Sequence, residues 1–165
     1  MIHSLSEVCE EVKRGYFHTV VYTYGVWDLI HPGHILLLER AKALGEVLIV
    51  GTVTDAPVSR LKGVDRPVQS LDDRMYIVGS LKCVNYVVRQ EGYDPTPELK
   101  YLAENGAVVH ILAKGDDWEK IPGSDYIESI GGKLVKLPYS KDWSTSKMVE
   151  KISGKAVEKF GEPVL

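Results

Sequence analysis

Short uncharged runs rich in apolar and β-branched residues recur along the chain and alternate with longer amphipathic stretches. Runs of this kind are typical of strands that are covered on both faces of a sheet. Glycine or polar turn residues border most of them. We therefore predict strands at residues 19–24, 47–50, 84–88, 108–112 and 134–137.

The stretches between these runs carry apolar residues at spacings of three and four, which predicts amphipathic helices. The clearest covers residues 4–14, where Ser4 is a suitable N-cap and Leu5, Val8 and Val12 share one face. Further helices are predicted at residues 32–44, 71–81, 95–105, 124–130 and from Ser144 onward.

The alternation predicts a single α/β domain of the Rossmann-like type, with a mostly parallel sheet of about five strands and helices on both faces. We place it at residues 18–153, after an N-terminal helical extension (1–17) and before a C-terminal tail (154–165). Ligands of such sheets bind at the carboxyl ends of the strands. The segments expected there are residues 25–34, a long polar loop at 54–70, a loop at 113–123 that begins with Ala113-Lys114, and the start of the last helix.

Composition excludes several classes of protein. With a net charge of −3, the chain lacks the basic surface of a general nucleic-acid binder. No apolar run approaches the ~18 residues that a membrane span needs. Cys9 and Cys83 have no metal-ligand spacing and no signal-peptide pattern is visible, so we expect buried free thiols and a cytoplasmic protein.

Residues 25–34 (GVWDLIHPGH) carry the clearest chemical signal. Gly25 interrupts a predicted strand, and Pro32 suits the first position of the following helix. A helix start presents free N–H groups and the positive end of the helix dipole, which favours an anion. His31 and His34 are three residues apart and share a helix face, and Gly33 between them allows close approach. The pattern predicts a phosphate site.

Neither a P-loop nor the G-x-G-x-x-G dinucleotide fingerprint is present. Instead, residues 25–34 resemble the G-x-F-D-x-x-H-x-G-H signature of the cytidylyltransferase-like nucleotidyltransferases, with Trp27 in place of the usual Phe. Further segments match that family in order and spacing, namely residues 61–67 (LKGVDRP), 73–74 (DR), 114–118 (KGDDW) and 144–146 (STS). The resemblance covers residues 18–153.

The resemblance implies transfer of a nucleoside monophosphate from a nucleoside triphosphate, with Mg²⁺ bound to the triphosphate and pyrophosphate as product. It implies a homodimer and catalytic roles for His31, His34 and Lys62, which would stabilise charge on the phosphates. Predicted nucleotide contacts are Gly25, Val26, Trp27, Gly33, Gly115, Asp116, Ser144, Thr145 and Ser146, and predicted substrate contacts are Asp28, Arg66 and Arg74. No candidate nucleophile adjoins the histidines, so we expect direct attack without a covalent enzyme intermediate.

Structural roles compete with several of these assignments. The histidine pair can cap a helix or fill the core, and Lys62 can be a solvated surface charge. Arg74 can form a salt bridge on a helix surface, and residues 144–146 can act as helix caps. The two histidines have no third ligand nearby in sequence, so no metal site made by the protein is expected.

Two subfamilies share features with this chain. Residues 115–119 (GDDWE) resemble glycerol-3-phosphate cytidylyltransferases, but Tyr139 stands where those enzymes have an arginine, and Lys82 and Asn85 also differ. Residues 60–68 (RLKGVDRPV), Thr96-Pro97 and the GGK at 131–133 resemble heptose-1-phosphate adenylyltransferases, which also lack that arginine. We therefore favour ATP and a heptose 1-phosphate-like acceptor over CTP with glycerol 3-phosphate or another polyol or amino-alcohol phosphate.

A non-catalytic nucleotide-binding regulator on the same scaffold is a third hypothesis. A sensor need not keep contacts that act only in the transition state. The presence of His31, His34 and Lys62 therefore favours an enzyme.

Overall fold

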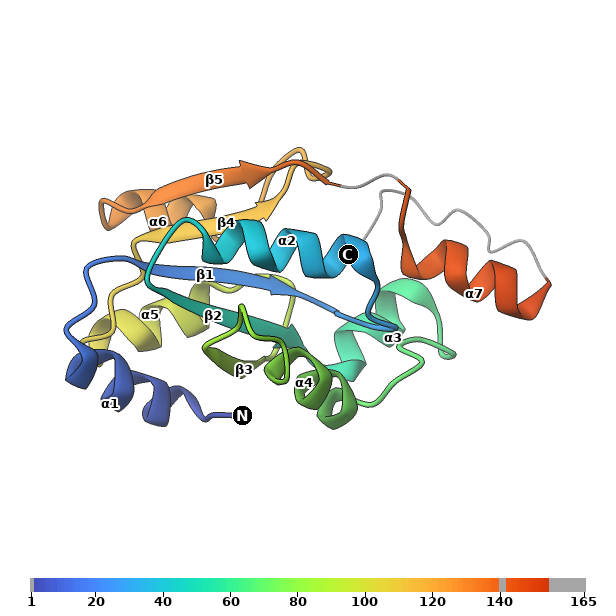
Figure 1. The fold of residues 1–165 in the computed structure, drawn as a ribbon, viewed down its shortest axis with the longest axis horizontal. Coiled ribbons are helices and arrows are strands. Elements are labelled where there is room, and N and C mark those ends of the chain that lie inside the picture. The colour runs from blue at the N-terminus through green and yellow to red at the C-terminus, as the bar shows by residue number, and fades with distance from the viewer. Residues whose placement is uncertain (1, 140–141, 155–165) are drawn as a thin grey trace.

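A five-stranded parallel sheet forms the centre of the computed structural model, which describes residues 2–139 and 142–154 (Figure 1). The strand order is β3-β2-β1-β4-β5, and each neighbouring pair is parallel. The strands are β1 (Val20–Gly25), β2 (Val47–Val53), β3 (Tyr86–Gln90), β4 (Ile111–Gly115) and β5 (Lys133–Leu137). The predicted Rossmann-like α/β fold with a parallel sheet is therefore confirmed.

Helices cover both faces of this sheet. They are α1 (Leu5–Gly15), α2 (Pro32–Lys42), α3 (Asp55–Lys62), α4 (Leu71–Gly79), α5 (Thr96–Glu104), α6 (Ser124–Ser129) and α7 (Thr145–Ser153). Helices α2 and α4 pack into the core on one face, and α1, α5 and α6 on the other. Helices α3 and α7 lie beyond the carboxyl ends of the strands, on the right of Figure 1. Residues 155–165 of the predicted tail lie outside the described residues.

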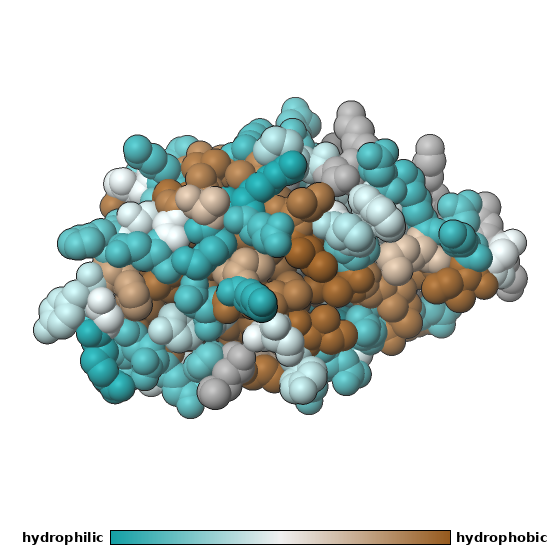
Figure 2. Space-filling model, viewed as in Figure 1, coloured by the Kyte–Doolittle hydropathy of each residue, from teal (hydrophilic) through white to brown (hydrophobic). Residues whose placement is uncertain are grey.

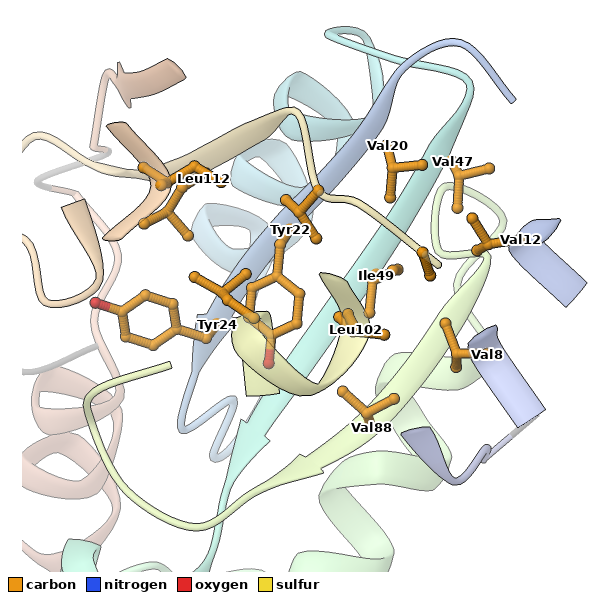
Figure 3. Packing of buried hydrophobic residues seen from close by; sticks show 14 of the residues in the cluster. Val8, Val12, Val20, Tyr22, Tyr24, Val47, Ile49, Val88, Leu102 and Leu112 are labelled. Atoms are coloured by element: carbon orange, nitrogen blue, oxygen red, sulfur yellow. The ribbon is translucent and has the colours of Figure 1, made fainter. Parts of the chain in front are cut away.

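The N-terminal helix is part of the core. Its start is fixed by a capping box, in which Ser4 Oγ accepts from Glu7 N and Ser4 N donates to the Glu7 carboxylate. Val8 and Val12 are buried against the sheet, and Figure 3 shows them pointing into the same cluster as Val20. Fully burying a side chain of this size contributes about 1.5–3 kcal/mol. The helix predicted over residues 4–14 is confirmed, and its inward face packs against the sheet.

The prediction of a long loop at residues 54–70 is wrong in its first half, because residues 55–62 form α3. In the sequence pattern Pro57 indicates a break. In the structure it lies in the first helical turn, where the backbone N–H groups have no intrahelical partner and proline costs little. Val58 then packs against Val26 and Val53, which anchors α3 at the carboxyl end of the sheet.

The fourth strand begins later than predicted. Val108 is 43% exposed, and pairing with β1 starts at Ile111, opposite Val21. Lys114, whose charge ends the apolar run, continues the strand and is buried. It therefore lies inside β4, whereas the sequence pattern placed it in the following loop.

Apolar surface is exposed close to α7. Figure 2 shows hydrophobic residues gathered across the middle of the viewed face and toward this helix. No residue of α7 is buried, and Ile152 is 78% exposed. A hollow of about 310 Å³ between α7 and the start of α2 is lined by Ile30, His31, Pro32, Trp143, Met148, Lys151 and Ile152. Within the described residues, no helix combines the length and apolar character that crossing a bilayer requires.

Candidate active site

The site lies where the strand order reverses, at the carboxyl ends of β1 and β4. Three contacts join the segments around it. Lys114 Nζ of β4 donates to Tyr24 O of β1 (2.7 Å), Arg66 Nε pairs with Asp28 Oδ2 (3.3 Å), and Thr145 Oγ1 of α7 donates to Asp28 O (2.8 Å). The segments predicted to converge therefore meet at one place.

The two histidines form a stacked pair at the start of α2. Their ring centres are 3.8 Å apart with an interplanar angle of 18°. His31 is the N-cap, and its Nδ1 accepts from His34 N at 3.4 Å. A neutral His31 that accepts at Nδ1 carries its proton on Nε2. His31 Nε2 and His34 Nδ1 are buried and have no hydrogen-bond partner among the described residues, so the hydrogen-bonding capacity of both atoms is unused.

Both histidines are neutral near pH 7. Burial lowers the pKa of His31. Burial, followed by the charges of His31, Lys62 and Lys114, lowers the pKa of His34 to about 3. The two histidines, Lys62 and Lys114 therefore lie close enough for their charges to influence one another. An anion bound among them would favour their charged forms.

The loop between β1 and α2 is fixed by packing. Trp27 adopts a left-handed φ of 58°, is 1% exposed, and donates through Nε1 to Gly51 O at 3.0 Å. A Cβ on Gly25 would lie 2.9 Å from the Trp27 ring. Val26 is also buried, against α3. The structure thus places Trp27 and Val26 as supports of the loop.

Gly33 permits the contact between the histidine pair and the segment before α7. A Cβ added there would lie 3.1 Å from the His31 ring and 3.1 Å from Trp143 Cβ. Contacts this short would push one of these neighbours away. Glycine at this position therefore keeps the start of α2 close to the residues that precede α7.

Asp28 and Arg66 form a buried pair beside Lys62. The Asp28 carboxylate also accepts from Val68 N (2.9 Å) and Gln69 N (3.0 Å), so it orders the segment that follows α3. Arg66 Nη2 is buried without a partner among the described residues. Lys62 is the last residue of α3, and its pKa falls to about 8 through burial and the adjacent Arg66 charge, against the opposing effect of Asp28. Lys62 therefore lies close to Arg66.

Arg74 has a different placement from the one predicted. It is fully buried in α4, and its guanidinium donates to Val53 O (2.9 Å), to Gln69 O (3.2 Å) and to Val26 O. It also pairs with Asp55 at the start of α3. A direct substrate contact and a surface salt bridge both disagree with this burial. Arg74 instead ties together the carboxyl ends of β1 and β2.

The polar side chains of residues 116–118, which follow β4, differ in whether they have hydrogen-bond partners. Asp116 accepts from Tyr139 N at 2.9 Å, which holds the chain after β5. In contrast, both carboxylate oxygens of Asp117 are buried and have no hydrogen-bond partner among the described residues. The same is true of Trp118 Nε1. Sequence reasoning chose Asp116 and missed Asp117 and Trp118. The segment GDDW contained the signal, but two adjacent aspartates cannot be distinguished without knowing which one pairs with the backbone.

The predicted cluster at residues 144–146 is structural in part. Ser144 is the N-cap of α7 and accepts from Lys147 N at 3.1 Å. Thr145 binds the carbonyl of Asp28, and Ser146 is exposed. Ser144 therefore acts as a helix cap, which was the structural alternative for this cluster. Thr145 holds the start of α7 against residues 26–31, the loop between β1 and α2, which is called the histidine loop below.

The described residues contain no group of three or more His, Cys, Asp or Glu side chains arranged to hold a metal ion. Magnesium, however, is commonly bound by one or two carboxylates together with substrate phosphates. The unpartnered Asp117 carboxylate is compatible with that mode.

Comparison with known proteins identifies a family and relatives for this chain. Residues 22–158 match the protein family described as cytidylyltransferase-like. The chain is 38% identical over 147 residues to the bifunctional protein HldE of Citrifermentans bemidjiense and 38% identical over 152 residues to that of Syntrophotalea carbinolica. These alignments cover 88% and 90% of this chain but 29% and 30% of the relatives, so the chain spans less than a third of their length.

Two solved structures share the fold. The lipopolysaccharide core biosynthesis protein from Thermoplasma volcanium superposes with a TM-score of 0.60 at 23% identity, over 74% of this chain and 98% of that one. Pantothenate synthetase from Thermus thermophilus superposes with a TM-score of 0.55 at 12% identity, over 96% of this chain and 71% of that one. At these identities the likeness concerns the fold alone.

Proposed function

The chain belongs to the cytidylyltransferase-like family, and we propose that it is a nucleotidyltransferase that joins a nucleoside monophosphate from a nucleoside triphosphate to a phosphorylated sugar. The observation that carries this proposal is the grouping of His31, His34 and Lys62 at the start of α2 and the end of α3. The charge of Lys62 reaches His34, and burial lowers the pKa of all three. A buried cluster of bases suits a polyanion such as a triphosphate.

In the proposed reaction, an oxygen of the acceptor phosphate attacks the α-phosphorus. The new P–O bond forms as the bond to the β-phosphate oxygen breaks, and pyrophosphate leaves with the electron pair. His31 Nε2–H donates to a phosphate oxygen, and Lys62 neutralises charge between the two substrates. One well-placed donor of this kind contributes about 3 kcal/mol to lowering the barrier.

Mg²⁺ would enter with the triphosphate and neutralise charge on its oxygens. On the protein side, Asp117 would supply a carboxylate whose two oxygens have no partner among the described residues, and the neighbouring basic groups would bind the phosphates directly. The residues present therefore fit a metal that is held mainly by the nucleotide.

For the substrates, we propose ATP and a heptose 1-phosphate-like sugar. The chain aligns with under a third of the length of the relatives named bifunctional protein HldE and so corresponds to one part of a protein with two functions. Residues 60–68 resemble heptose-1-phosphate adenylyltransferases, and Tyr139 departs from the cytidylyltransferase pattern. CTP with a polyol phosphate is the second candidate, favoured by GDDWE at residues 115–119.

We further propose a cytoplasmic homodimer with small-molecule substrates, and neither nucleic acid nor membrane as a partner. Free thiols at Cys9 and Cys83 are compatible with a reducing compartment. The exposed apolar side chains near α7, including Trp143 and Ile152, supply surface that a second copy could cover.

A pyrophosphate-release assay tests the function. ATP and CTP are each paired with heptose 1-phosphates, glycerol 3-phosphate and amino-alcohol phosphates, and we expect the fastest release with ATP and a heptose 1-phosphate. Faster release with CTP and glycerol 3-phosphate would select the second candidate. Nucleotide binding without release for any pair would identify a regulator, and a nucleotidylated enzyme trapped without acceptor would contradict direct attack.

A further inference from the structure

Lys114 is a buried cation to which none of the roles above has been given. The residue is 1% exposed and extends from β4, next to β1. Its Nζ donates to Tyr24 O at 2.7 Å and lies 4.2 Å from the Tyr24 ring centre and 5.5 Å from the Trp118 ring centre. Among the described residues, no carboxylate forms an ion pair with it. An ammonium has three N–H donors, so two remain for other acceptors.

The contact between Lys114 Nζ and the Tyr24 carbonyl lies at the edge of the proposed nucleotide site. The Tyr24 carbonyl lies immediately before Gly25, where β1 ends and the loop toward His31 begins. Trp118 belongs to the segment after β4 that also contains the unpartnered Asp117. One side chain therefore joins the two strand ends that flank the crevice.

The surroundings of Lys114 make its charge sensitive to a bound anion. Burial lowers its pKa to about 7; the Asp117 carboxylate opposes this effect, and the Lys62 ammonium of α3 adds to it. The phenol of Tyr24 on β1 has a pKa raised far above neutral and stays uncharged, and His34 of α2 is neutral at pH 7. A phosphate chain beside His34 and Lys62 would add negative charge and favour the protonated amine.

We propose that Lys114 is a positioning residue of the nucleotide site, which holds the end of β1 through the Tyr24 carbonyl and becomes fully protonated only when the phosphates of a nucleotide occupy the crevice. Nucleotide binding is then linked to the uptake of a proton. This inference rests on the proposed nucleotide site and adds a residue and a pH dependence to it.

Calorimetric titration of the full chain with Mg²⁺–ATP, in two buffers that differ in ionisation enthalpy, measures the protons taken up. Through Lys114, wild type is expected to take up on the order of one proton per ATP at pH 8 and much less at pH 6, and this contribution lowers its affinity by up to about tenfold per pH unit above pH 7. Lys114→Met should abolish this extra uptake. Equal uptake in wild type and Lys114→Met would overturn the proposal.

Lys136→Met is the matched control. Lys136 stands opposite Lys114 in the register of β4 and β5, and it is exposed. It should keep the proton uptake of wild type. Lys62→Met separates the two lysines, because uptake that disappears in this variant but persists in Lys114→Met would assign the proton to Lys62 and overturn the proposal.

A measurement on wild type covers the case in which Lys114→Met does not fold. In protein with ¹³C-labelled lysine, the Cε resonance of one lysine should titrate near pH 7 without nucleotide and remain in the charged form up to pH 9 with Mg²⁺–ATP. The absence of any lysine that titrates near pH 7 without nucleotide, apart from Lys62 near pH 8, would overturn the proposal. Failure of ATP to bind at all would overturn the proposed function as well, whereas ATP binding without Lys114-dependent uptake would overturn this inference alone.

Discussion

Asp28 and Arg66 form an ion pair in which 1% and 9% of the two side chains are exposed, at the point where the histidine loop meets the segment after α3. Asp28 also accepts two backbone N–H groups from that segment, and its own carbonyl accepts from Thr145 of α7. One residue therefore links three parts of the site. Asp28 therefore shapes the crevice by holding these segments together, and its effect on the substrate is indirect.

Asp28→Ala is expected to destabilise the protein by about 3–5 kcal/mol, because it leaves the Arg66 charge buried without its partner. Urea denaturation measures this loss. Asp28→Asn keeps an oxygen for only one of the two N–H groups, that of Val68 or that of Gln69, and should recover part of the stability. An unchanged unfolding midpoint for Asp28→Ala would show that the pair contributes little.

His34→Ala is expected to keep the fold and to lower turnover by roughly 10²–10³-fold, which is the usual effect of removing one group that stabilises developing charge. Pyrophosphate release measures turnover, and circular dichroism checks the fold. His18→Ala is the control, since His18 is exposed and lies before β1. Full activity in His34→Ala would show that the site is elsewhere.

Sequence pattern was sufficient for the elements whose causes are local. Ser4 and Ser70 both act as N-caps of the helices predicted after them, and Pro32 occupies the first turn of α2. The errors arose where tertiary packing decides. Pro57 lies within a helix that Val58 anchors, and Lys114 continues a buried strand because the Tyr24 carbonyl and two aromatic rings receive its ammonium. Tyr24, which supplies the carbonyl and one of the two rings, is 90 residues from Lys114 in sequence.

Among the site residues too, those placed by local sequence were predictable and those placed by tertiary packing were not. The histidine pair was predictable, because its geometry follows from a helix start and an i, i+3 spacing. The placement of Arg74 was not, because its acceptors are the carbonyls of Val26, Val53 and Gln69, which come together only in the folded sheet.

Substitutions at the two adjacent aspartates should separate their roles. Asp117→Asn is expected to raise KM for the nucleotide several-fold, because it removes the buried carboxylate that has no partner among the described residues. Asp116→Asn keeps an oxygen for Tyr139 N and should change KM little. Steady-state kinetics with varied nucleotide measures both. A larger effect at Asp116 would return the nucleotide contact to the residue that the sequence favoured.

The lowered pKa of Lys62 leads us to expect opposite pH dependences for stability and activity. Its pKa is about 8 in the folded protein, against 10.5 as the ordinary value. Between these values the unfolded chain binds more protons than the folded one, so the free energy of unfolding rises with pH in this window, by at most about 1.4 kcal/mol per unit. The protonated amine is the form that binds phosphate, so kcat/KM should fall more steeply above pH 8 than the proposed titration of Lys114 alone would produce. Lys62→Met should flatten the stability profile between pH 8 and 10, measured by urea denaturation at each pH. Lys62→Arg should keep its charge and remove the steeper part of the decline in kcat/KM above pH 8. A wild-type kcat/KM that stays constant to pH 10 would contradict a role for the Lys62 charge.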